Sequence, residues 1–130
     1  MAILHKYISI ILLIALASAY PDLCAKTCSM NLLSGRVWVH SHEEDTDAVK
    51  VYRPSTFSFP LSRGRDKFQF QKDGTLIIYS IGRSDRLNEI HARWKKISVD
   101  TFRIRPDNSA IPPFDMKVIS CANDIVSVQK

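Results

Sequence analysis

Apolar and polar residues alternate with a period of two in several short stretches of the chain. The clearest is residues 67–71 (KFQFQ), where Phe68 and Phe70 fall on one face of an extended chain. Asp73 and Gly74, a pair favoured in tight hairpin turns, follow this stretch, and residues 75–81 (TLIIYSI) supply the returning strand. The same alternation predicts strands at residues 36–40, 49–53, 56–59, 90–97, 99–105, 114–121 and 124–129.

Turn-forming and polar residues separate these stretches. Pro54 and Pro60 interrupt the pattern, Gly64 lies in a polar loop at residues 61–66, and the block 41–47 (SHEEDTD) carries four acidic residues, which predicts a solvated loop. Further loops fall at residues 82–89 and 106–113, and a last turn is centred on Ala122 and Asn123. Roughly eight or nine short strands predict an all-β fold, an antiparallel meander that forms a small barrel or a strongly curved sheet.

Residues 85–97 fit two kinds of element. Leu87, Ile90, Trp94 and Ile97 recur at helical spacing, but residues 90–97 (IHARWKKI) also alternate, with Trp94 on one face. We predict a strand here, because the segments on both sides are predicted as strands.

The N-terminus has the pattern of a secretory signal peptide. His5 and Lys6 precede an apolar run at residues 7–16, and Ala17-Ser18-Ala19 forms a small-residue cleavage signal. The apolar run is shorter than the roughly 20 residues that a membrane-spanning helix needs. We therefore expect residues 1–19 to be removed, leaving residues 20–130 as a single secreted, extracellular β domain with no membrane segment.

Composition and charge add few constraints. With 130 residues, 45% hydrophobic and 24% charged, the chain has room for one globular domain. Loss of residues 1–19 removes one lysine and leaves 17 basic against 13 acidic residues, a net charge of +4. Such a small excess is typical of a solvated surface, and we expect no nucleic-acid binding.

The chain has three cysteines, an odd number, in a protein expected to meet an oxidising compartment. Either Cys24 or Cys28 is expected to bridge to Cys121, and a Cys24–Cys28 bridge is a geometrically demanding alternative. The remaining thiol would be buried or would link two molecules as a disulfide-bonded dimer. The spacing of the three matches no zinc signature.

Two arginines around a glycine, Arg63-Gly64-Arg65, form the strongest candidate for a ligand site. Guanidinium groups bind carboxylate, sulfate or phosphate through paired hydrogen bonds, and glycine leaves the backbone accessible. Arg83 and Arg86 could approach the same end of the fold if the hairpin folds back. In the alternative, which we favour, these arginines fix loop geometry by pairing with nearby carboxylates, namely Asp66, Asp73 and Asp85.

Catalytic and metal-binding patterns are weak. His40 and His42 lie beside the acidic block 43–47 at a spacing that can hold a divalent ion, but no second cluster completes the ligand set, and a polar loop is the preferred interpretation. His91 has no acid and nucleophile at a motif spacing. We therefore predict a protein that is not an enzyme and has no cofactor.

Several short motifs together resemble small secreted lipocalin-like proteins of the calycin type. The resemblance covers about residues 34–105, although Gly35-Arg36-Val37-Trp38 has one residue more than the Gly-x-Trp signature of that family. It implies a barrel around an apolar interior. If this interior takes a ligand, we expect Arg63, Arg65, Arg83 and Tyr52 to be the ligand-binding residues. In a domain of 111 residues the interior would be small, or filled by aromatic side chains. The motifs are Trp38, Tyr52-Arg53-Pro54, residues 59–65 (FPLSRGR), Asp73-Gly74 and Arg93-Trp94, and the filling side chains would be Trp38, Phe57, Phe68, Phe70 and Trp94.

Two functions from different classes fit these observations. The first is a secreted carrier that binds a small apolar or amphipathic ligand, with Arg63, Arg65 and Arg83 meeting an acidic head group. The second is an extracellular structural or interaction protein, such as a matrix, secretion or venom component, whose interior is packed and whose outer surface does the work.

Overall fold

The computed structural model describes residues 28–130, so the expected signal peptide and Cys24 lie outside the described residues. Eight strands and two short helical segments make up this part of the chain. In chain order they are α2 (Met30–Leu33), β1 (Trp38–His40), the 3-10 helix η2 (His42–Glu44), β2 (Val49–Pro54), β3 (Lys67–Phe70), β4 (Thr75–Ile81), β5 (Leu87–Lys96), β6 (Thr101–Pro106), β7 (Phe114–Ala122) and β8 (Ile125–Gln129).

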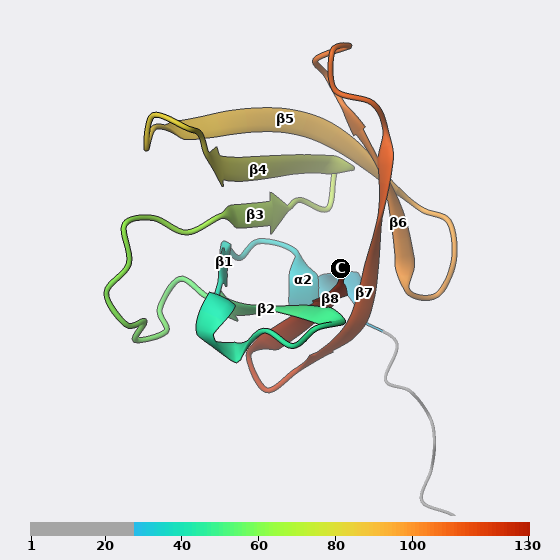
Figure 1. Ribbon diagram of the computed structural model, residues 1–130. Coiled ribbons are helices and arrows are strands. Elements are labelled where there is room, and N and C mark those ends of the chain that lie inside the picture. The colour runs from blue at the N-terminus through green and yellow to red at the C-terminus, as the bar shows by residue number, and fades with distance from the viewer. Residues whose placement is uncertain (1–27) are drawn as a thin grey trace, which may run out of the picture.

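The eight strands form a closed barrel in which every neighbouring pair is antiparallel (Figure 1). The prediction of an all-β antiparallel barrel is therefore confirmed. Strands β3 to β8 follow one another around the barrel as a meander. The first two strands are exchanged relative to a simple meander, because β2 pairs with β8 and β1 lies between β2 and β3.

Turn residues with positive φ close two of the hairpins. Gly74, at φ 94°, ends the β3–β4 turn, where the N–H of Gln71 donates to the carbonyl of Thr75, so the expected hairpin is confirmed. Asn123 and Asp124, at φ 53° and 57°, form the two-residue turn between β7 and β8. This turn lies one residue later than expected, because these two side-chain types tolerate the left-handed conformation better than alanine does.

One predicted strand is wrong, and the helix that was the alternative for residues 85–97 is excluded. Residues 56–59 form no strand, because Pro54 and Pro60 bracket them, and they lie instead in the loop between β2 and β3. The helix considered for residues 85–97 is also absent, since residues 87–96 form β5, a strand paired on its two sides with β4 and β6.

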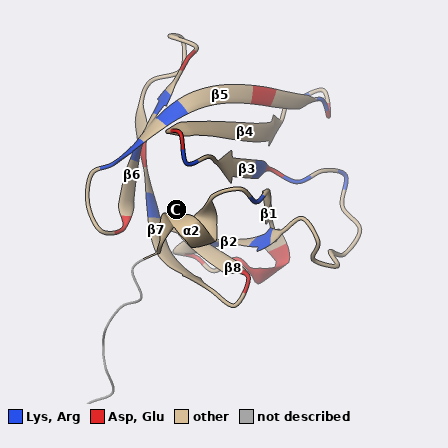
Figure 2. Ribbon diagram, turned by 180° about the vertical axis from the view of Figure 1, so that it is seen from behind, with Lys and Arg blue, Asp and Glu red and all other residues tan. Residues whose placement is uncertain are grey.

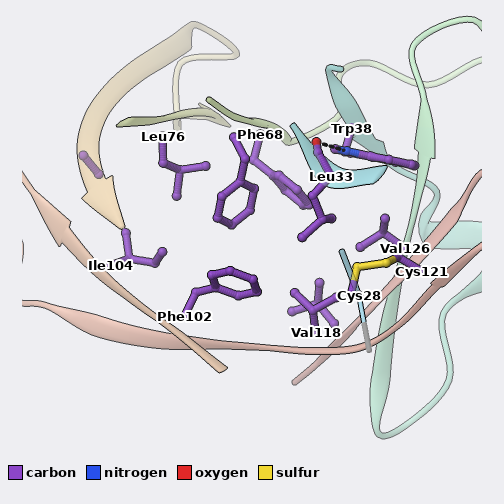
Figure 3. Close-up of a cluster of buried hydrophobic side chains, with 13 residues drawn as sticks. Cys28, Leu33, Trp38, Phe68, Leu76, Phe102, Ile104, Val118, Cys121 and Val126 are labelled. Carbon is purple, nitrogen blue, oxygen red and sulfur yellow. Dashed lines mark hydrogen bonds between the residues drawn. A yellow bond between two sulfur atoms is a disulfide. The ribbon is translucent and has the colours of Figure 1, made fainter. Parts of the chain in front are cut away.

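Large side chains fill the barrel (Figure 3). Phe70, Phe102, Leu76 and Ile104 have no exposed surface, and the rings of Phe70 and Phe102 lie 5.2 Å apart between centroids. Of the aromatic residues expected in the interior, three are buried and Trp94 packs against the core, whereas Phe57 is 36% exposed in the β2–β3 loop. The three buried ones are Trp38, Phe68 and Phe70.

The segment before β1 closes one end of the barrel. Ser29 caps the single turn of α2, and Leu33 has no exposed surface within the core cluster. The indole N–H of Trp38 donates to the carbonyl of Leu33 at 2.9 Å, as the dashed line in Figure 3 shows. A disulfide joins Cys28 to Cys121 of β7, with their Cα atoms 5.3 Å apart, so Cys28 is the partner of Cys121.

Candidate functional site

The expected ligand-binding residues lie on three elements. Arg63 and Arg65 are in the β2–β3 loop, Arg83 is in the β4–β5 turn, and Tyr52 is in β2. The β2–β3 loop packs on the end of β4, because a Cβ added at Gly64 would lie only 2.9 Å from Ile81 Cδ1. The arginine loop and the β4–β5 turn thus lie at the same end of the barrel.

The side chain of Arg65 is 8% exposed and fully engaged. Its guanidinium donates two hydrogen bonds to the Glu43 carboxylate, at 2.8 and 2.6 Å, and one each to the carbonyls of His40 and Pro60. The hydrogen bonds from Arg65 are the largest cause that lowers the pKa of Glu43 to about 2. Arg65 therefore fixes loop geometry, as the favoured alternative predicts, but its partner is Glu43 and none of the three expected aspartates.

The acidic block 43–45 holds three neighbouring segments of chain. Glu44 accepts two hydrogen bonds from Arg53 of β2, at 2.9 and 2.6 Å, in addition to the pairing of Glu43 with Arg65. Asp45 contacts the ring Nε2 of His40, and one of its oxygens accepts from the backbone N–H of Val51. This part of the loop predicted at residues 41–47 is thus a clamp in which Glu43, Glu44 and Asp45 each have a partner.

Tyr52 faces the barrel. Its ring lies 4.7 Å from that of Phe68 and 5.1 Å from that of His40, between centroids. Burial raises the pKa of Tyr52 to about 12, so the phenol stays neutral at physiological pH. The described residues provide no ion pair or side-chain hydrogen bond for Arg63 or Arg83, and both arginines are exposed.

A second cluster of cations lies on the outer face of the barrel. Arg93 pairs with Arg105 and Lys95 with Arg103 across the β5–β6 ladder, so four cationic side chains occupy two adjacent rows. We call these four residues the β5–β6 basic face; blue segments of β5 and β6 meet there in Figure 2. They line a hollow of about 300 Å³ together with Trp94 and the half-exposed Ile97.

The β5–β6 basic face is bordered by acidic side chains. The guanidinium of Arg103 donates to both oxygens of Asp115, at 2.9 and 3.2 Å, and this hydrogen bonding raises the pKa of Arg103 and lowers that of Asp115. Asp73, near Arg93, is bonded to Thr75 in its own turn. Among residues 28–130, no carboxylate lies within salt-bridge distance of Arg93, Lys95 or Arg105.

Sequence reasoning missed this cluster because it weighed arginines by their closeness along the chain. The usable signal was the alternation itself, since Arg93 and Lys95 lie two residues apart in one strand and Arg103 and Arg105 two apart in the next. Residues so spaced point to one side of a sheet, opposite the buried Phe102 and Ile104.

Comparison with known proteins gave no family assignment. No family model, curated protein or solved structure matches the chain. Within residues 28–130, no helix has the length and apolarity needed to cross a membrane, and no three histidine, cysteine or acidic side chains are grouped so as to hold a metal ion.

Proposed function

We propose that this protein is a secreted, non-enzymatic interaction protein that works through the outer surface of a filled barrel. The observation that carries the proposal is the packed interior. Six side chains with no exposed surface come from five elements around the barrel. They are Leu33, Phe70, Leu76, Phe102, Ile104 and Val126.

A ligand inside such a barrel would need space that these side chains occupy. Pockets for small molecules have volumes of roughly 300–1,000 Å³ and bury most of the ligand. Here the ring of Phe70 lies 5.2 Å from Phe102 and 5.9 Å from Trp94, between centroids, so aromatic contacts cross the interior. Leu33 closes one end of this cluster.

The disulfide supports the secreted location. Cys28–Cys121 joins the N-terminal segment to β7, and structural disulfides are typical of oxidising compartments. If residues 1–19 are a signal peptide, protein recovered from the medium of expressing cells begins at Tyr20. Intact-mass measurement tests this, and retention of residues 1–19 would contradict the secreted location.

A lipocalin-type carrier is the second candidate, favoured by the closed eight-stranded barrel. Two observations count against it. Strands β1 and β2 are exchanged relative to an up-and-down barrel, and Arg65, the expected contact for an acidic head group, is held by Glu43.

Displacement of a fluorescent fatty acid distinguishes the two functions. We expect no saturable binding to the wild-type protein. Phe102→Ala removes a fully buried ring and should create an apolar cavity that takes up benzene but not the fatty acid, whereas Phe57→Ala makes the same change at a 36% exposed position and should create no such cavity. Saturable binding by the wild type, weakened by Arg65→Gln, would overturn the filled-barrel proposal in favour of a carrier.

A further inference from the structure

The β5–β6 basic face places like charges directly opposite each other twice. Residues opposite each other in an antiparallel pair have Cβ atoms about 5 Å apart, and alternate residues along one strand are about 7 Å apart. Arg93 faces Arg105 and Lys95 faces Arg103, so four cationic groups surround the hollow of about 300 Å³.

This arrangement does not help the fold. Like charges directly opposite in a sheet are destabilising, and only Arg103 gains an ion pair from the described residues, with Asp115. The arginines that do stabilise this structure, Arg53 and Arg65, have low exposure and two hydrogen bonds each to a carboxylate. Charged side chains that have no partner and lower the stability of the fold are expected where a surface binds a ligand.

We propose that the β5–β6 basic face binds a sulfated polysaccharide. This inference rests on the proposed function, in that it names the class of partner that the outer surface recognises. A two-by-two set of cations suits a ligand with several anionic groups better than a single small anion. Sulfate is permanently ionised and accepts paired hydrogen bonds from arginine, and the 45% exposed Ile97 offers an apolar contact to the C–H face of a sugar ring.

The same surface is poorly suited to nucleic acid. Single strands bind on exposed aromatic rings, which stack against the bases. The aromatic residue at this hollow is Trp94, whose indole turns away from the surface: its N–H donates to the carbonyl of Gln71, and its ring lies 5.9 Å from Phe70 and 5.8 Å from Phe102, between centroids. A sulfated polysaccharide therefore fits this surface better than nucleic acid does, and single-stranded DNA serves as a comparison in the test.

The test measures binding of the full secreted chain to heparin, a sulfated polysaccharide, over a range of salt concentrations. The first variant carries Arg93→Gln, Lys95→Gln and Arg105→Gln, which leaves the Arg103–Asp115 pair intact. The matched control carries Arg63→Gln, Arg83→Gln and Arg86→Gln, which removes the same amount of positive charge from exposed arginines. These arginines lie in the β2–β3 loop and the β4–β5 turn, at the end of β4 that is distant from Gly74.

We expect the wild type to bind heparin at 0.15 M salt. Each contact that releases a counterion contributes roughly fivefold at that concentration, so the first variant should bind on the order of 100-fold more weakly. Its plot of log affinity against log salt should also be shallower by about three. The control should change affinity by less than about threefold. Because the first variant removes pairs of like charges, it should fold as the wild type does, and its midpoint of thermal unfolding should not fall.

Three results would overturn the proposal: no heparin binding by the wild type at 0.15 M salt, an equal loss in both variants, or binding of single-stranded DNA that is as tight as heparin binding and equally sensitive to the first variant. The last would assign the surface to nucleic acid. None of these results depends on the fatty-acid experiment. If the protein binds neither heparin nor the fatty acid, the polysaccharide proposal is wrong, but the proposed interaction function is not contradicted.

Discussion

The Cys28–Cys121 disulfide predicts a large and specific loss of stability when the bond is removed. It closes a loop with a sequence separation of 93 residues, from the segment before α2 to β7. In the chain-entropy model a loop of this length restricts the unfolded chain by about 4–5 kcal/mol. For a domain of this size, about 4 °C per kcal/mol gives a decrease of roughly 15–20 °C in the midpoint of thermal unfolding.

The perturbation is the double variant Cys28→Ala and Cys121→Ala. Alanine is suitable because both cysteines are buried, at 3% and 5% exposure, among apolar neighbours. Thermal unfolding followed by circular dichroism, with and without reductant, gives the midpoints. Reductant should lower the wild-type midpoint towards that of the double variant and should leave the double variant unchanged.

Cys24→Ser is the matched control for this pairing. Because Cys28 is the partner of Cys121, the control should keep the wild-type midpoint and lose only a thiol or an intermolecular bond. A fall in midpoint for Cys24→Ser equal to that of the double variant would refute the pairing. A loss of less than about 1 kcal/mol in the double variant would instead refute the loop-entropy reasoning.

Three further perturbations test the carboxylate clamp at residues 43–45, the β3–β4 turn, and the packing of Leu33 at the end of the barrel. Arg65 lowers the pKa of Glu43 from its ordinary value of 4.5 to about 2. The pair therefore stabilises the fold at pH values above about 4.5, and this stabilisation is lost as the pH falls from about 4.5 to 2. Arg65→Gln should flatten that part of the pH–stability profile. Gly74→Ala, at φ 94°, should destabilise by about 1–2 kcal/mol in urea unfolding. Leu33→Ala should destabilise by about 2–5 kcal/mol by the same measurement, because it removes a fully buried side chain from the end of the core.

Two of these perturbations have a comparison variant within the chain. Arg63→Gln removes the same charge without a partner and should keep the wild-type pH profile, so an equal change in both variants would contradict the clamp. Leu32→Ala, at a 51% exposed position next to Leu33, should lower the free energy of unfolding only slightly. An equal loss of stability in the two leucine variants would contradict a role for Leu33 in closing the end of the barrel. An unchanged urea midpoint for Gly74→Ala would contradict the strain expected for alanine at the positive φ of this turn.

Local patterns in the sequence predict much of the barrel. The period-two run at residues 67–71, followed by Asp73-Gly74, is enough to predict the β3–β4 hairpin, because strand alternation and turn chemistry both act over a few residues. The error at residues 56–59 has a similar local origin. Phe57 and Phe59 alternate as in a strand, but their rings pack against each other, 4.9 Å apart, in a loop bracketed by prolines.

Features that depend on distant partners could not be predicted in this way. Arg65 meets Glu43 across 22 residues, and the sequence offered three closer aspartates that it does not use. The exchange of β1 and β2 depends on β2 finding β8 at the other end of the chain. The β5–β6 basic face needed the register between two strands, which places Arg93 opposite Arg105.

The closure of the barrel also limits how another protein can attach to it. A common way to capture a peptide is to add it as a further strand, which needs a free row of backbone N–H and C=O groups. Among the strands of residues 28–130, such groups occur where neighbouring strands differ in length, as in residues 87–90 of β5, which pair with β4 but precede the first pair with β6. Glu89 lies in that stretch, and a charged residue at an edge discourages strand addition. If the protein has the interaction function proposed above, we expect its partners to be selected by side-chain chemistry, so that recognition can change through substitutions that leave the backbone of the barrel as it is.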